Sequence, residues 1–243
     1  METVLIVTAA VLWGWSTGVF LPRPAYRLCV PGEEAWRSAC PAGHPFSGVG
    51  GGWVGRARCA AGDRYGPSTL SAASCVAVVC ALLAVAVGPR PELVVWLLLA
   101  PAAVLLAIID FAVHRLPDVL TLPLAAAVLL LLVVAAVLPG SAGSWRSAVL
   151  GSFVLGACFF VFFLLSRGFG FGDVKLALVV GAVLGWYGWA IVLAGTFAGF
   201  VFGALYGIGL VLAGRADRGS PVPFGPFLLA GAVAGVLLGS EVS

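Results

Sequence analysis

The stretch that decides the fold reads Gly168-Phe169-Gly170-Phe171-Gly172-Asp173-Val174-Lys175. It lies between two apolar runs, 148–165 and 176–184, so its carboxylate stands at the edge of a membrane. An ionisable group at that position is costly and usually has a function. The glycines before Asp173 allow unusual backbone angles and the close approach of another chain. We therefore expect Asp173 to belong to a functional site.

The composition of the whole chain is that of a polytopic membrane protein. Of the 243 residues, 62% are hydrophobic and only 9% are charged, too few to cover the surface of a soluble domain of this size. The net charge of +3 is small and gives no reason to expect a nucleic-acid partner. The apolar runs are continuous rather than alternating, which excludes a membrane β-barrel.

The predicted fold is an all-α membrane helix bundle with about eight transmembrane helices. Its organisation would be a first transmembrane helix over 1–21, a small cytoplasmic loop over 22–69, and a membrane domain over 70–243. Glycines that repeat every four residues in the seventh span predict close packing against another helix. The helix boundaries around 186–190 stay open. The eight apolar runs are 4–21, 70–87, 93–109, 119–138, 148–165, 174–187, 190–213 and 224–238.

The basic residues predict the orientation. With eight alternating spans, eleven of the thirteen Lys and Arg residues lie on one side, and only Arg90 and Arg146 lie on the other. By the positive-inside rule the eleven face the cytoplasm, and both termini lie outside. The eleven are Arg23, Arg27, Arg37, Arg56, Arg58, Arg64, Arg115, Arg167, Lys175, Arg215 and Arg218.

Two pieces of the 22–69 loop resemble each other, because each has a polar residue four positions after a cysteine. They are Cys40-Pro41-Ala42-Gly43-His44 and Cys59-Ala60-Ala61-Gly62-Asp63. Zinc in a structural site takes four such ligands. A small folded loop with free thiols is the simpler interpretation, since no CxxC pair is present and disulfides are rare in the cytoplasm. The candidate metal ligands are Cys40, His44 and Cys59, with Asp63 or Cys29 as the fourth.

The partner of Asp173 is expected in the second acidic stretch, which runs from Ile109 to Asp118. Asp110 ends an apolar run, where a negative charge is unfavourable for the helix dipole, so a purely structural role explains it poorly. Asp118 follows Pro117 at the start of the next run and is interpreted as a helix N-cap. We therefore expect Asp110, rather than Asp118, to meet Asp173.

Two carboxylates in one site suit aspartic proteolysis. One pKa rises, the pair holds a proton, the ionised member activates water, and the protonated member donates to the scissile carbonyl. Gly170, Gly172 and Lys175 would then form the loop that receives the substrate backbone. His44 and His114 are the only histidines, and His114 is interpreted as a solvated loop residue. A proton-coupled transporter is the alternative of another class, since intramembrane acids also relay protons.

Three motifs together resemble the type IV prepilin peptidase family over 93–238. Gly170-Phe171-Gly172-Asp173 followed by Val174-Lys175-Leu176 resembles its GxGD motif. Asp110 followed by Leu116-Pro117-Asp118 and Thr121-Leu122-Pro123 resembles its first aspartate segment, and Pro223-Phe224-Gly225-Pro226-Phe227 its C-terminal motif. A presenilin-type intramembrane protease also uses GxGD, but the Tyr-Asp motif expected there is absent from the first acidic span.

The resemblance implies that Asp110 and Asp173 are the catalytic pair. The enzyme would cut the basic leader from prepilin-like precursors at the cytoplasmic face of the bacterial inner membrane, usually after a glycine. It would need no cofactor for the cleavage, and its partners would be those precursors and membrane lipid.

The amino-terminal part departs from the family pattern. Gly18-Val19-Phe20 through Tyr26-Arg27-Leu28 resembles the exit of the first span. Cys40…Gly43 and Arg56-Ala57-Arg58-Cys59…Gly62 resemble the segment where bifunctional members carry two CxxC pairs, with glycine here at each second position. Zinc, and N-methylation with S-adenosylmethionine, are implied only for members with the full pattern and stay open for this chain.

Overall fold

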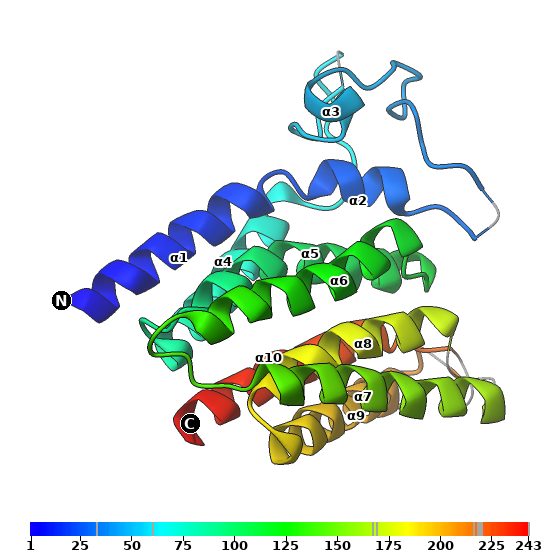
Figure 1. Cartoon of the computed structure of the whole chain (residues 1–243). Coiled ribbons are helices and arrows are strands. Elements are labelled where there is room, and N and C mark those ends of the chain that lie inside the picture. The colour runs from blue at the N-terminus through cyan, green and yellow to red at the C-terminus, as the bar shows by residue number, and fades with distance from the viewer. Residues whose placement is uncertain are drawn as a thin grey trace.

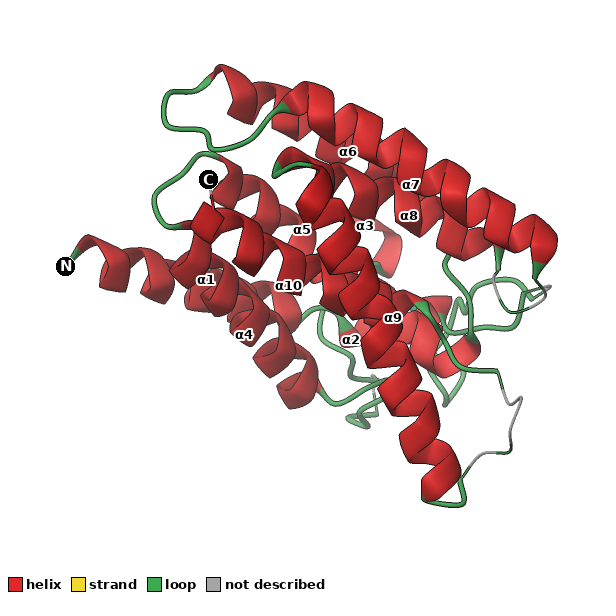
Figure 2. Cartoon of the chain, turned by 90° about the horizontal axis from the view of Figure 1, so that it is seen from below, coloured by secondary structure: helices red, strands yellow, loops and turns green. Residues whose placement is uncertain are grey.

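The computed structural model describes residues 1–32, 34–59, 61–166, 168, 170–215, 217 and 221–242. Phe169, Arg167 and Arg218, which entered the sequence argument, lie outside these residues. The described part is helical, as predicted, and its β-contacts are two isolated bridges (Figures 1 and 2). The helices are α1 (Glu2–Gly18), α2 (Pro22–Leu28), α3 (Val49–Gly52), α4 (Thr69–Val87), α5 (Glu92–Val113), α6 (Asp118–Val137), α7 (Trp145–Leu165), α8 (Phe171–Trp186), α9 (Trp189–Leu212) and α10 (Gly225–Val242).

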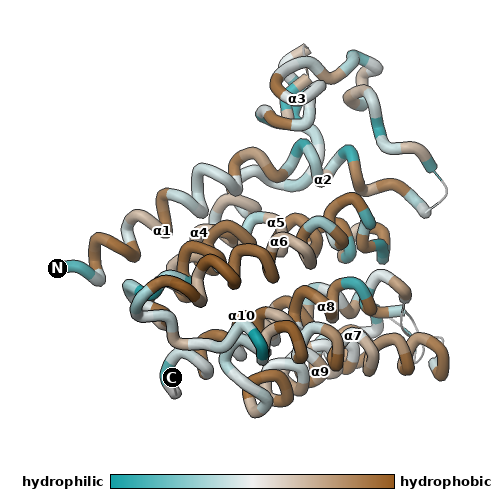
Figure 3. The backbone as a smooth tube through the Cα atoms, in the orientation of Figure 1, coloured by the Kyte–Doolittle hydropathy of each residue, from teal (hydrophilic) through white to brown (hydrophobic). Residues whose placement is uncertain are grey.

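The eight long helices coincide with the eight predicted apolar runs. Five of them, α4, α5, α6, α7 and α9, are each long and apolar enough to cross a membrane. The pair α1 and α2, bent by 44° at their junction, makes a sixth candidate span. Hydrophobic residues dominate these helices, whereas hydrophilic residues gather at their ends and in the loops (Figure 3). The chain is therefore a multi-pass helical membrane protein, and the count of eight spans stays a prediction.

Small residues let neighbouring helices touch backbone to backbone. A Cβ built on Gly18 would lie 2.6 Å from Ala73 Cα, and one built on Gly14 would lie 2.8 Å from Ala77 Cα. From Gly18 back to Gly14 in α1, the contacted residue moves forward from Ala73 to Ala77 in α4, so the two helices are antiparallel. Such close approach gives van der Waals contact where lipid offers no hydrophobic driving force.

The glycine repeat of the seventh predicted span packs as expected. In α9, a Cβ on Gly199 would lie 3.1 Å from Leu228 Cα, and one on Gly195 would lie 3.0 Å from the Gly231 carbonyl oxygen of α10. The predicted close packing is thus confirmed, and its partner is α10.

Hydrogen bonds and a helix-ending backbone turn shape the two ends of the bundle. At one end, Arg90 Nη1 donates to the Ser240 carbonyl at 3.2 Å, and Ala142 N donates to the buried Glu92 carboxylate at 3.2 Å. At the other end, α5 closes at His114, whose φ of 51° lies in the left-handed region. This second end carries the loop between α1 and α4 and the predicted acidic stretches.

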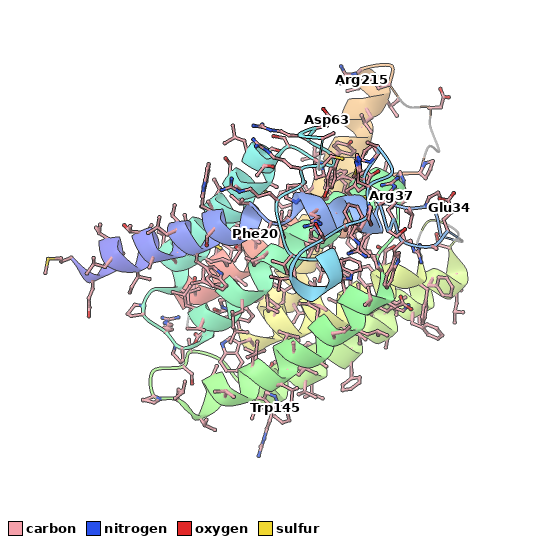
Figure 4. The ribbon with its side chains drawn as sticks, turned by 90° about the horizontal axis from the view of Figure 1, so that it is seen from above. Phe20, Glu34, Arg37, Asp63, Trp145 and Arg215 are labelled. Carbon is pink, nitrogen blue, oxygen red and sulfur yellow. The ribbon has the colours of Figure 1, made fainter. Side chains whose placement is uncertain are left out.

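The loop between α1 and α4 contains two short helices that the sequence analysis did not predict, α2 and α3. Helix α2 begins at Pro22, and proline is tolerated in a first helical turn because that turn has no intrahelical N–H bond to lose. The segment 22–69 lacks a helical period, so this short helix left no signal in the pattern. Figure 4 views the molecule from the side of this loop, with Arg37 and Asp63 on it and Trp145 at the far edge.

We predict that Gly181→Ala lowers the melting temperature, whereas Gly209→Ala does not. A Cβ at 181 would lie 2.3 Å from the Gly151 carbonyl oxygen in α7, while position 209 has no neighbouring atom within 4 Å. Overpacking of this kind costs about 1–3 kcal/mol, and alanine in an open helical position gains up to about 1 kcal/mol over glycine. Tryptophan fluorescence of both variants in one detergent measures the difference. Equal melting temperatures would contradict the close contact between α7 and α8.

Candidate active site

Asp110 lies in the last turn of α5 and is buried. Its Oδ2 accepts a hydrogen bond from the backbone N–H of Gly225, the first residue of α10, at 3.0 Å. The positive end of the α10 dipole therefore faces this carboxylate and offsets the unfavourable end of α5. An acid at a helix C-terminus was expected to need a special environment, and the start of a second helix provides it.

Asp173 is buried in the first turn of α8, three residues after the N-cap Gly170. Its Oδ2 accepts from Gly170 N at 2.9 Å, and its own N–H donates to the Gly170 carbonyl at 3.0 Å. A carboxylate that returns to the N-cap backbone stabilises the start of a helix. The glycine-rich stretch therefore orients Asp173 locally, since the hydrogen bond that the described residues give its carboxylate comes from the start of α8.

Both carboxyl groups line one cavity of about 310 Å³. Two glycines from different motifs pack against residues that line the cavity, at positions where a side chain would clash with them. A Cβ on Gly225 would lie 2.8 Å from Asp110 Oδ2, and a Cβ on Gly172 would lie 2.9 Å from Leu116 Cβ. The lining residues are Asp110, His114, Arg115, Leu116, Gly168, Gly170, Phe171, Gly172, Asp173, Pro221, Val222, Pro223 and Phe224.

The two carboxyl groups leave one oxygen each for chemistry. Within the described part of the chain, Asp110 and Asp173 each accept a single hydrogen bond, in both cases at Oδ2. Two carboxyl groups that share one site do not both ionise readily, because their charges repel each other. The arrangement can therefore hold one proton between two acids while an oxygen of each faces water or substrate.

Asp118 does not cap α6, contrary to the sequence interpretation. The N-cap is Pro117, and Asp118 is the first helical residue, with no capping hydrogen bond from its side chain. Its carboxylate instead forms an ion pair with Lys175 of α8. Lys175 lies within α8 rather than in the glycine loop, and it is not among the described residues that line the cavity.

The other sequence-predicted site residues, Gly170 and Gly172, line the cavity as the glycine pattern suggested. Sequence reasoning missed the role of Gly225, although the proline-rich segment before α10 was a visible signal. It also missed Arg115, which lines the cavity and donates from Nη1 to the Pro31 carbonyl at 3.1 Å. That bond attaches the loop between α1 and α4 to the wall of the cavity. His114 is exposed, as predicted, and also lines the cavity.

The two similar pieces of the loop come together in space. His44 Nδ1 lies 3.0 Å from Cys59 Sγ, and the two sulfur atoms of Cys40 and Cys59 lie 2.6 Å apart. The three ligand atoms all lie within 4.8 Å of one another, and both cysteines are free thiols. The hydrogen bond with Cys59 lowers the pKa of the Cys40 thiol to about 7.

The backbone around the cluster forms two equivalent turns. Cys40 N donates to the His44 carbonyl at 2.9 Å, and Cys59 N donates to the Asp63 carbonyl at 2.7 Å. Two thiols and one imidazole on such turns fit the donor set of a structural zinc site, with one position left for a further ligand. Among the described residues, neither Asp63 nor Cys29 joins the group.

Comparison with known proteins identifies relatives of this chain. The family described as type IV leader peptidase matches residues 97–208, which include Asp110 and Asp173. A prepilin leader peptidase/N-methyltransferase of Aeromonas hydrophila is 36% identical over 238 residues, covering 91% of this chain and 76% of the relative. One from Burkholderia pseudomallei (strain K96243) is 33% identical over 236 residues, covering 88% of this chain and 70% of the relative.

No solved structure matches the chain significantly. The identity extends over most of the chain and of each relative, and the family match contains both acidic segments that face the cavity. The chain belongs to the type IV leader peptidase family.

Proposed function

We propose that this protein is a membrane aspartic peptidase that removes the leader from prepilin-like precursors, with Asp110 and Asp173 as its catalytic pair. The observation that carries the proposal is that two buried carboxyl groups line one cavity, each anchored at Oδ2 by a glycine N–H. The names of the relatives supply the substrate class. A transporter has no support from these relatives, and their names give a leader peptidase rather than a protease of transmembrane segments.

In the proposed mechanism the pair carries one proton. The ionised carboxylate takes a proton from a water molecule, which attacks the scissile carbonyl carbon, and the protonated partner donates to the carbonyl oxygen. Collapse of the tetrahedral intermediate breaks the C–N bond, and the amine leaves with a proton from the pair. Asp173 and Asp110 can exchange these roles, because Oδ1 of each accepts no hydrogen bond from the described residues.

The substrate would enter as extended backbone beside the glycines at 168, 170 and 172, where side chains would fill the space. We place this cavity at the cytoplasmic face of the bacterial inner membrane, on the basis of the thirteen basic residues and their asymmetry along the chain. The basic leader of a precursor lies on that same face before cleavage.

Cys40, His44 and Cys59 would bind a zinc ion that supplies structural order to the loop. The cleavage uses the carboxyl pair and needs no metal. The relatives' names also include an N-methyltransferase, and adding S-adenosylmethionine to the cleavage reaction tests that activity by the mass of the new N-terminus.

Asp110→Asn and Asp173→Asn are each expected to reduce leader removal by roughly 10²–10⁴-fold, the usual contribution of acid–base catalysis. Asparagine keeps the shape and the acceptor for the glycine N–H but cannot exchange the proton. The assay follows conversion of a purified prepilin-like precursor to its mature form by mass spectrometry, with protein in lipid nanodiscs. Asp118→Asn serves as the control and should retain most of the activity. Full activity in either of the first two variants would refute the assigned pair.

Gly225→Ala is expected to reduce cleavage by at least about 10-fold, because the new methyl group displaces Asp110 and catalytic geometry tolerates only small displacements. The substitution changes no charge and removes no catalytic group. Gly209→Ala, at an open position of α9, is the matched control. Unchanged kcat in Gly225→Ala would show that the added methyl group does not displace Asp110 from its catalytic position.

Purified protein is expected to contain one zinc ion per chain, lost in Cys40→Ser and Cys59→Ser but retained in Cys75→Ser. Cys75 is a free thiol of α4 outside the cluster. Elemental analysis by mass spectrometry gives the metal content directly, and leader removal should continue in the metal-free protein. Equal zinc content in all three variants would argue against the cluster as the ligand set.

A further inference from the structure

A second cavity of about 310 Å³ lies where the loop meets the ends of α1 and α4, apart from the carboxyl pair. Three arginines form one side of it. Its other wall is apolar except for Thr69. The lining residues are Trp15, Val19, Arg56, Ala57, Arg58, Arg64, Thr69, Leu70 and Ala73.

The three arginines differ from the others of the same loop in what they bind. Arg23 and Arg27 donate to loop carbonyls, and the Arg27 guanidinium lies 3.8 Å from the Trp53 ring centroid. Arg37 donates to the Tyr26 carbonyl at 2.6 Å. These side chains hold the loop together. In contrast, no described residue pairs with the guanidinium group of the cavity's arginines, and the one ion pair of the described chain lies elsewhere.

We expect the cavity to lie at the level where lipid headgroups meet the protein. It lies at the loop ends of two candidate spans, α1 with α2 and α4. Trp15 is 43% exposed and Leu70 is 65% exposed, although both belong to apolar helices, so both face the surrounding lipid. Tryptophan at such a boundary is typical of the membrane interface. The cavity therefore presents positive charge toward the headgroup region and apolar surface toward the acyl chains.

We propose that this cavity binds the phosphate of an anionic membrane lipid, with its acyl chains along Trp15, Val19 and Leu70. Guanidinium groups suit phosphate because their planar donors match two of its oxygens. A zwitterionic headgroup brings an ammonium group that the arginines repel. A soluble phosphate uses the arginines but gains nothing from the apolar wall. The proposal does not depend on the peptidase assignment.

The test compares lipid binding in detergent by native mass spectrometry, with phosphatidylglycerol and phosphatidylcholine as the two probes. Arg56→Gln/Arg64→Gln is expected to weaken phosphatidylglycerol binding by roughly 30-fold, since each basic residue near anionic lipid contributes about 1 kcal/mol, a factor of about five. Phosphatidylcholine binding should stay within about twofold. Arg146→Gln/Arg215→Gln removes two exposed arginines outside the cavity and is the matched control.

A second variant keeps all arginines. Thr69 is the first residue of α4, where an added carboxylate favours the helix, so Thr69→Glu should fold and repel the phosphate. Loss of phosphatidylglycerol preference in both the double variant and Thr69→Glu supports the site. An equal loss in the control pair, or an unchanged preference in Thr69→Glu, overturns it. Glycerol 3-phosphate tests the source of the phosphate: displacement of lipid at comparable concentrations would assign the cavity to a soluble anion instead.

Discussion

The structure depends on the hydrogen bond between the Gly225 N–H and the Asp110 carboxylate. A buried acid at a helix C-terminus is disfavoured by the helix dipole and by desolvation, and it persists only if a partner meets it. Here the partner is the start of another helix, 115 positions later in the chain. The bond fixes where α10 begins relative to α5. It also restricts position 225 to glycine, because a Cβ would contact the same oxygen.

Both acids are buried and accept a hydrogen bond at Oδ2 from a glycine N–H, but different parts of the chain orient them. Asp173 is oriented by Gly170, within its own helix start, so its position needs only the first turn of α8. Asp110 is oriented by α10, which in turn is placed by its backbone contacts with α9. Disturbing the α9–α10 contact should therefore move Asp110 while leaving Asp173 in place. The position of Asp110 in the cavity is thus sensitive to packing far from it.

The sequence analysis predicted those features that a local pattern of residues encodes. Apolar runs gave the eight long helices, and the unusual positions of Asp110 and Asp173 gave the pair that lines the cavity. Contacts between distant segments left no such pattern. The ion pair of Asp118 with Lys175 was therefore mistaken for a helix cap, since a proline followed by an acid is also what a helix start looks like. The catalytic assignment and the cytoplasmic orientation stay predictions.

Two kinds of polar contact contribute to the order of the loop between α1 and α4. One is the cluster of Cys40, His44 and Cys59, which suits a metal. The other is the stacking of Arg27 on Trp53, together with arginine bonds to loop carbonyls. The second kind of contact needs no metal, because the charge of each guanidinium is met by ring faces and backbone oxygens.

Other arginines do not stabilise the loop in this way. Arg115 connects the loop to the wall of the carboxyl cavity through the Pro31 carbonyl, so the loop is part of the environment of that cavity. Arg56 and Arg64 point their charge at a separate opening beside α1 and α4. A lipid bound there would contact α1, α4 and the loop together. The position of the loop against the membrane would then depend on headgroup charge, while its internal fold would not.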